Sequence, residues 1–150
     1  MPQLETEYIK TGKVKYVFSD LPLESLHPYA FKAAEATNCA GEQGKFWEMH
    51  DRLYANQTAL KPTDLPQHAQ ALELDMAKFQ QCLDSGKHAS SIRKDMAAAG
   101  KAGLTGTPTF LVGVQEANSP KVKFLKVFFG AVPYATFKDA LDTALSSLKQ

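Results

Sequence analysis

Cysteine and histidine side chains act as nucleophiles, redox groups and metal ligands, so their spacing is the first indication of chemistry in this chain. The two cysteines, Cys39 and Cys82, do not form a Cys-x-x-Cys pair. The four histidines show no ligand spacing such as His-x-x-x-His; they are His27, His50, His68 and His88. The sequence therefore predicts no structural zinc site, and we expect no metal and no other cofactor.

The stretch LTGTPTFLVG, residues 104–113, is the second place where the residue types suggest chemistry. It places Pro108 directly before a run with strand character. Proline has no N–H to donate to a ladder, so it is found at strand starts and edges. Two interpretations stay open at this point: a simple strand entry, or a cis proline that a site requires. Because only about 5–6% of X-Pro bonds in folded proteins are cis, the residues alone favour the first.

The histidines are interpreted as structural residues. His50 lies between Glu48 and Asp51, but residues one or two positions apart do not share a helix face, so no acid–base dyad is predicted. His27 stands before Pro28 as a helix-entry residue. The remaining two are predicted to be solvated; they are His68 and His88.

Five aromatic residues could form a substrate platform, but their spacing fits core packing better. They are Phe46, Trp47, Tyr54, Phe128 and Phe129. In KVKFLKV, lysines alternate with apolar residues; they are Lys121, Lys123 and Lys126. This pattern predicts a half-exposed strand with its lysines outward, which guards an edge against pairing.

The composition is that of an ordinary globular protein. The 150 residues are enough for one domain that buries about two-thirds of its unfolded surface. With 44% apolar and 22% charged residues and a net charge of +1, the chain has no electrostatic signature for nucleic acid or an anionic membrane. No apolar run approaches the ~18 residues of a transmembrane helix. The first residues, MPQLETEYIK, do not predict a signal peptide.

Alternating apolar residues predict one early strand over Lys13–Ser19 and two late strands, TFLVG and KVKFLKVFFG. A polar hairpin loop joins the late strands; it contains Asn118, Ser119 and Pro120. Apolar residues three to four positions apart predict helices between these strands and at both ends. Their ranges are 3–10, 28–56 with a glycine interruption, 63–74, 75–85 with Gly86 as its stop, one ending near Gly103, and one from about Pro133 to Leu148. This order predicts one α/β domain over residues 1–150 with a helical insertion at about 27–103.

Three stretches carry a resemblance to a known family. The first is HPYAFKAAEATNCAGEQGKFWEMHDRLYANQ, and the second is FQQCLDSGKHASSIRKDMAAAGKAGLTGTPTFLVG. The third is VFFGAVPYATFKDALDTAL. They resemble the helical insertion, the proline loop and the final strand and helix of the DsbA-like thioredoxin-fold proteins. The resemblance covers essentially residues 3–148, and its most specific piece is the G-T-P-T-F run.

The resemblance implies a thioredoxin-like fold of the DsbA type and a substrate site at Thr107 and Pro108. Pro108 takes the place of the family's cis proline, and the backbone of Thr107 pairs with a substrate peptide as an added strand. The implied partners are polypeptide thiols and disulfides. The implied location is periplasmic or otherwise extracytoplasmic, although this sequence shows no signal peptide. Neither a nucleic-acid nor a membrane partner is expected.

The resemblance also bears on the two cysteines. Both fall on inward-facing positions of predicted helices, where two buried free cysteines are one interpretation. Because the family works in oxidising compartments, where disulfides persist, we favour a structural disulfide between Cys39 and Cys82. Neither cysteine is predicted to be catalytic.

The sequence departs from the family at its start. The family's Cys-x-x-Cys follows a first strand that has no counterpart here, so the sheet is expected to be N-terminally truncated. Without that low-pKa thiolate, this chain alone is not expected to catalyse thiol–disulfide exchange. An assigned start at an internal methionine and a naturally shortened, redox-inactive relative both explain the difference.

The same departure leads to an expectation about assembly. In the family the missing strand lies between the strands corresponding to Lys13–Ser19 and Thr109–Gly113, so their facing edges are left unpaired. We expect these two strands either to close up directly or to pair with a second copy, as a homodimer or by strand exchange.

Three functions remain open. The first is a DsbA-like thiol–disulfide oxidoreductase or isomerase-type domain, inactive as this chain because its Cys-x-x-Cys is absent. The second is a non-catalytic thioredoxin-like binding or chaperone-type module that uses the same proline groove. A relative of the glutathione-dependent isomerases of this fold is the weakest of the three.

Overall fold

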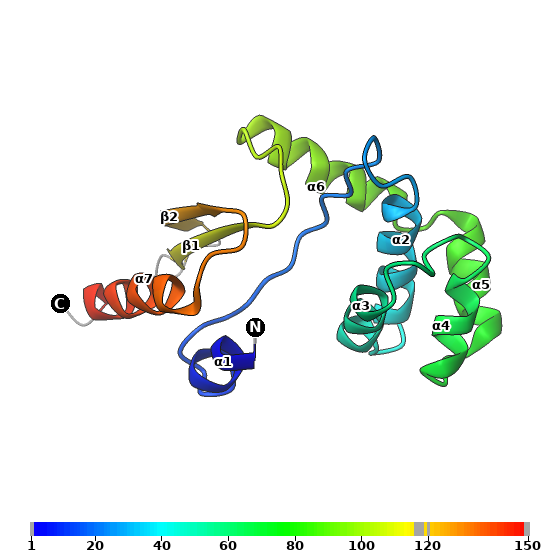
Figure 1. The fold of residues 1–150 in the computed structure, drawn as a ribbon, viewed down its shortest axis with the longest axis horizontal. Helices are drawn as coiled ribbons and strands as arrows, with labels where there is room; N and C mark the ends of the chain where they lie inside the picture. Colours follow the sequence, from blue (N-terminus) through cyan, green and yellow to red (C-terminus); the bar gives the residue numbers. More distant parts are fainter. Residues whose placement is uncertain (1, 116–118, 120, 149–150) are drawn as a thin grey trace. The chain divides into compact units, whose positions relative to one another are not determined.

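A computed structural model describes residues 2–115, 119 and 121–148 of the chain. The chain forms two compact units, one from residues 1–18 together with 104–150 and one from residues 19–103. The second unit therefore lies, in sequence, between the two segments of the first (Figure 1). It ends at Gly103 and begins at Ser19, somewhat earlier than the insertion start predicted from the sequence.

Residues 19–103 form a helical unit whose elements are α2 (Ala30–Gly41), α3 (Phe46–Ala55), α4 (Leu65–Ala71), α5 (Met76–Ser85) and α6 (Ala89–Lys101). Its core is built around four large side chains that are almost fully buried; they are Met49, Leu65, Phe79 and Ile92. The small residues Ala36 and Ala40 of α2 are also fully buried, which lets neighbouring helices approach α2 closely.

Local signals in the sequence account for the bounds of α5. The Asp75 carboxylate accepts a hydrogen bond from the Lys78 N–H at 3.1 Å, as an N-cap residue does. Gly86 ends the helix with φ 62°, the left-handed conformation that glycine adopts without steric penalty. The predicted stop is confirmed. Asp64, at the start of α4, forms no such cap, because its side chain accepts instead from the Lys61 N–H at 3.1 Å.

The other unit combines α1 (Pro2–Leu4), a π-helical turn η1 (Glu5–Ile9), β1 (Thr109–Gln115), β2 (Val122–Phe129) and α7 (Tyr134–Ser147). Its core gathers Tyr8, Val112, Phe128, Phe137 and Leu141. The Tyr8 hydroxyl donates a 2.6 Å hydrogen bond to the Asp142 carboxylate, which ties the N-terminal segment to α7. Helices together with a small antiparallel sheet confirm the predicted α/β class.

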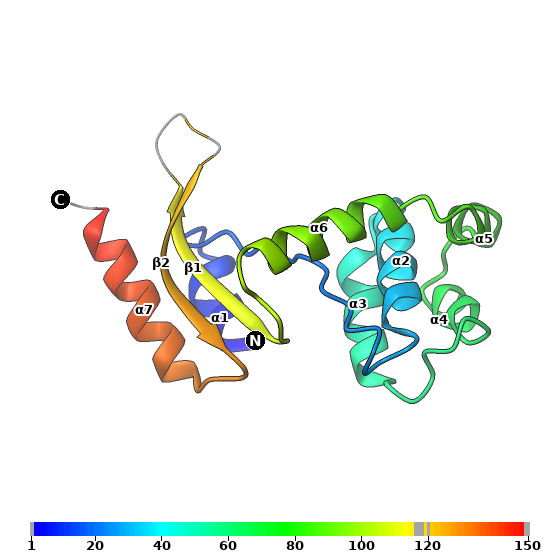
Figure 2. The same ribbon diagram turned by 90° about the horizontal axis from the view of Figure 1, so that it is seen from above.

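The described sheet has two antiparallel strands, β1 and β2, with α7 beside them (Figure 2). Thr109 pairs with Phe129 and Val112 with Lys126, and the register shifts between Val112 and Gly113. Such a shift is a β-bulge, which increases the local twist of the strand. The predicted hairpin loop falls largely outside the described residues, since Asn118 and Pro120 are not among them.

The prediction of a strand over Lys13–Ser19 is wrong. These residues have the predicted burial alternation, with Val14, Tyr16 and Phe18 half-buried, yet the segment has no strand structure. The backbone N–H groups of Lys13 and Val14 bond to Tyr8 of the preceding turn instead. Alternation shows only that a segment is extended; a strand also needs a neighbour for its ladder. The two segments predicted to flank a gap do not close up on each other as a strand pair.

One face of the sheet is apolar and exposed. Leu111, Phe124, Val127 and Phe129 share this face through the register of the ladder, and each is between 38 and 67% exposed. The lysines of this strand are exposed as predicted, but the prediction that β2 is only half-exposed is wrong, because Phe128 alone of its residues is buried. The opposite face carries Phe110, Val112 and Phe128 against Phe137 of α7.

Candidate functional site

The loop before β1 is the first candidate site. The Thr107–Pro108 peptide bond is cis, and both residues are exposed. Hydrogen bonds hold the loop on either side of Thr107: the Thr109 hydroxyl donates to the Gly106 carbonyl at 2.7 Å, and the Gly130 N–H donates to the Pro108 carbonyl at 2.8 Å. Within the described part of the chain, the Thr107 backbone has no hydrogen-bond partner. Thr107 is therefore accessible, and hydrogen bonds on both sides of it hold the loop in place.

The strand that follows has a free edge. β1 pairs with β2 along one side, and the described residues supply no strand for its other side. An edge with unpaired N–H and C=O groups is a template for an added strand. Thr107 and the free edge of β1 therefore form one continuous stretch of backbone that a partner strand can reach.

The disulfide of the helical unit is the second candidate site. Cys39 of α2 and Cys82 of α5 are bonded to each other, with their Cα atoms 5.9 Å apart. The predicted pairing is present in the structure. The two residues are only 1% and 6% exposed, so the sulfur atoms lie inside the core of this unit. The bond joins α2 and α5, which are also linked by the Lys32 ammonium donating to the Leu83 carbonyl at 2.6 Å.

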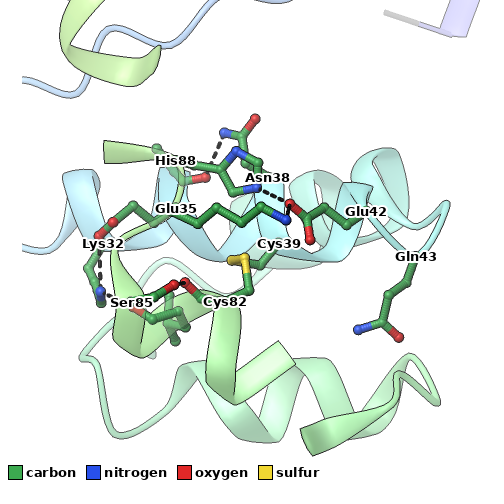
Figure 3. Close-up of a disulfide and its surroundings, with 12 residues drawn as sticks. Lys32, Glu35, Asn38, Cys39, Glu42, Gln43, Cys82, Ser85 and His88 are labelled. Carbon is green, nitrogen blue, oxygen red and sulfur yellow. Dashed lines mark hydrogen bonds and ion pairs between the residues drawn. A yellow bond between two sulfur atoms is a disulfide. The ribbon is translucent and has the colours of Figure 1, made fainter. Parts of the chain in front are cut away.

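His88 lies beside this disulfide. One of its ring nitrogens and both cysteine sulfurs lie within 4.8 Å of one another (Figure 3). The ring also donates to the Glu42 carboxylate, with 2.8 Å between Nε2 and Oε1, and Lys87 approaches the same carboxylate at 2.7 Å. The Lys87 ammonium, followed by His88, holds the pKa of Glu42 below its ordinary value.

Sequence reasoning missed this cluster. His88 was predicted to be solvated, but its side chain is 22% exposed and has Glu42 as a partner. The sequence feature that could have indicated this cluster is Gly86, which ends α5. The turn there places the residues that follow the helix close to the disulfide. Cys82 and His88 flank that turn, so their proximity follows from the helix stop rather than from a recognised ligand spacing.

The prediction for His68 is wrong as well. It is 5% exposed, accepts a hydrogen bond from Arg52 Nε at 3.1 Å, and contacts the Ala59 carbonyl at 2.8 Å through Nε2. Both ring nitrogens thus have partners, as expected of a buried polar group. His50 Nδ1 lies 2.9 Å from the Asp51 carboxylate, so these adjacent residues do touch despite their different faces on α3.

The aromatic residues divide into core and surface. Phe128 is buried as predicted, whereas Trp47, Tyr54 and Phe129 are 44, 61 and 67% exposed, and for these three core packing is wrong. On α3 the rings of Trp47 and Tyr54 lie on either side of His50, at centroid distances of 5.4 and 4.6 Å. The helical spacing of Trp47, His50 and Tyr54 accounts for the contacts between their rings, but the rings of Trp47 and Tyr54 are exposed rather than packed in the core.

Asp20 is a partly buried carboxylate in the helical unit. It accepts from Asn38 Nδ2 at 2.9 Å, while its own N–H donates to the Asp95 carboxylate at 3.4 Å. Burial raises the pKa of Asp20 above its ordinary value, and the nearby charge of Asp95 raises it further. The hydrogen bond from Asn38 and the charges of His50 and His88 lower this pKa, but the net shift is upward. Neither its position nor its environment was predicted from the sequence.

Replacing this carboxylate by an amide, Asp20→Asn, is expected to raise the free energy of unfolding at pH 7 by about 0.5 kcal/mol. A raised pKa in the folded state means that folding disfavours the charged form of Asp20. The wild type is therefore destabilised at pH values above the folded-state pKa, and this destabilisation disappears below the ordinary pKa of 3.8. The difference should vanish as the pH falls to about 3.5. Urea denaturation at both pH values measures it, with the exposed Asp139→Asn as control. A destabilised variant at pH 7 contradicts the assignment.

Comparison with known proteins gives one family. Residues 1–127 match the family model described as thioredoxin. A protein from Salinispora tropica named Na(+)/H(+) antiporter NhaA 3 is 46% identical over 119 residues, which are 79% of this chain and 18% of that protein. One from Mycolicibacterium gilvum named Na(+)/H(+) antiporter NhaA 1 is 36% identical over 107 residues, 70% of this chain and 17% of that protein.

The chain thus spans less than a fifth of the length of these relatives. Among the residues that the structure describes, no helix has the length and apolar character needed to cross a membrane. The family model, by contrast, covers α6 and β1, which lie on either side of the proline loop in the sequence, and most of β2. This chain belongs to the thioredoxin family.

Proposed function

We propose that this chain presents extended polypeptides to a redox centre, as the substrate-binding part of a DsbA-like thiol–disulfide oxidoreductase domain. Its thioredoxin-family fold is the general type that carries out thiol–disulfide exchange. The observation that supports the binding role is Thr107, which is exposed and whose backbone has no hydrogen-bond partner among the described residues, while hydrogen bonds fix the loop around it.

The binding mode is the addition of a strand. An extended polypeptide pairs its main chain with Thr107 and continues along the free edge of β1. Main-chain pairing gives affinity without selecting a particular sequence, which suits a domain that acts on many unfolded chains. The loop needs no rearrangement for this, so little ordering entropy opposes binding.

In the exchange reaction a thiolate attacks a disulfide sulfur of the polypeptide and forms a mixed disulfide, while the other sulfur leaves as a thiolate. Cys39 and Cys82 do not supply this nucleophile, because they are bonded to each other and buried. The attacking thiolate must come from outside these two residues. Oxidising, extracytoplasmic surroundings suit such a domain and its disulfide.

A non-catalytic binding module is the second candidate. It is favoured by the same two facts, an accessible Thr107 edge and the sequestered sulfurs. The relatives' name describes whole proteins of which this chain matches under a fifth, so we carry no ion transport over to this chain.

The test is binding of a permanently unfolded, alkylated polypeptide to the ¹⁵N-labelled chain, followed by amide chemical shifts. We expect shifts to concentrate at Gly106–Leu111 and to leave α4 and α5 unchanged. In Thr107→Arg a long charged side chain obstructs the edge, and affinity should fall about tenfold, equivalent to ~1.4 kcal/mol.

The matched control is Thr105→Arg, which adds the same charge at another exposed threonine of the loop and should bind like the wild type. Equal affinity of the two variants, or shifts confined to the helical unit, contradicts the proposed surface.

Sedimentation of the free chain tests the predicted homodimer at the same edge: a dimer that Thr107→Arg dissociates places a second copy there.

A further inference from the structure

We propose that Cys39 and Cys82, once reduced, form a Zn²⁺ site together with His88. In the oxidised chain the two sulfurs are joined and the site is closed. Reduction converts the same three side chains into two thiolates and an imidazole, a ligand set that zinc prefers. The cluster therefore acts as a redox-dependent metal site, separate from the Thr107 loop.

The geometry supports three ligands to one ion. The sulfurs and a ring nitrogen of His88 already lie within 4.8 Å of one another. Tetrahedral zinc with Zn–S bonds of about 2.3 Å and Zn–N bonds of about 2.1 Å separates its ligand atoms by roughly 3.5–3.8 Å. Side-chain rotation reaches these separations without moving the helices, whose Cα atoms at Cys39 and Cys82 are 5.9 Å apart.

The surroundings support a metal ion in other ways. Glu42 holds the His88 ring through a 2.8 Å contact (Figure 3), as carboxylates commonly do for ligating histidines. The Lys87 ammonium lies 2.7 Å from the same carboxylate. The sulfurs are buried, whereas His88 is partly exposed, so an ion can enter from the His88 side. Two thiolates neutralise the charge of the ion in this low-dielectric place, and the fourth position is open to water.

The conversion balances with a dithiol as reductant. The dithiol gives two electrons and two protons to the Cys39–Cys82 bond, which breaks into two thiols, while the dithiol closes into its own disulfide. Zn²⁺ then forms two Zn–S bonds and displaces the two thiol protons into solvent. A disulfide oxidant reverses the conversion: it takes two electrons from the thiolates and two protons from solvent to become a dithiol, while the Cys39–Cys82 bond re-forms and the ion is released.

The experiment uses the full chain, reduced under nitrogen and freed of reductant, and titrated with Zn²⁺ against a chromophoric chelator. We expect one Zn²⁺ per reduced chain and none tightly bound to the oxidised chain. Co²⁺ as a probe should give thiolate-to-metal charge-transfer absorption with the visible bands of a tetrahedral site. The reduced His88→Ala variant should bind Zn²⁺ more than tenfold more weakly than the reduced wild type.

The control is His27→Ala, at an exposed histidine outside the cluster, which should bind like the wild type. Circular dichroism accompanies each titration. If reduction loosens the helices, Zn²⁺ should restore them in the wild type and much less in His88→Ala. Equal binding by oxidised and reduced chains, equal binding by His88→Ala and the wild type, or a reduced chain that neither binds Zn²⁺ nor refolds with it overturns the proposal.

Discussion

Replacing both bridging cysteines, as Cys39→Ala/Cys82→Ala, is expected to lower the free energy of unfolding by about 4 kcal/mol. The bridge closes a loop with a sequence separation of 43 residues, and removing it returns the conformational entropy of that loop to the unfolded chain. The estimate exceeds the effect of most single substitutions. It falls on the helical unit, because both cysteines lie in α2 and α5.

Urea denaturation followed by far-ultraviolet circular dichroism measures the loss. The wild type treated with a reductant in the presence of a metal chelator provides an independent comparison and should lose a similar amount. The chelator matters because free thiols beside His88 bind metal ions. A double variant within 1 kcal/mol of the oxidised wild type contradicts the expected contribution of the bridge.

A methyl group at position 113, introduced by Gly113→Ala, is expected to destabilise the sheet by about 2 kcal/mol. A Cβ built there lies 2.7 Å from a Val122 methyl carbon and 2.9 Å from the Lys123 carbonyl oxygen. The valine side chain can rotate away, but the carbonyl belongs to the partner strand and cannot. Relief therefore requires β1 and β2 to separate at the bulge, where their register shifts.

The control is Gly106→Ala, because a Cβ at Gly106 meets no atom within 4 Å. Thermal unfolding of both variants, together with amide exchange along β1 and β2, tests the prediction. Gly113→Ala should melt at lower temperature and exchange faster in both strands, while Gly106→Ala should resemble the wild type. A Gly113→Ala sheet with unchanged protection contradicts the close approach at this position.

The helices could be predicted from the sequence because their determinants are local. Side-chain spacing sets the buried face, and single residues such as Asp75 and Gly86 set the ends of α5. The strands β1 and β2 are neighbours along the chain, so their pairing was also within reach. The segment 13–19 was not, because whether an extended run becomes a strand depends on a partner elsewhere, and alternation carries no information about that partner.

The candidate sites show the same limit. Thr107, Pro108 and the Cys39–Cys82 pair followed from the resemblance of whole stretches rather than from their own residue types. His88 could not be placed near the cysteines, because that contact depends on how the chain turns at Gly86 while α2 and α5 pack together. The exposure of Phe129 likewise depends on which face of the sheet α7 covers, and β2 carries apolar residues on both.

The division of the chain has a consequence for its synthesis. The helical unit, residues 19–103, is contiguous and rich in local contacts, so it can fold as soon as it leaves the ribosome. Tyr8 must wait for its partner Asp142, which lies 134 residues later. At 5–20 residues per second that delay is roughly 7–27 s. Until then Tyr8 lacks its Asp142 partner, so residues 19–103 can fold before this contact of the other unit forms.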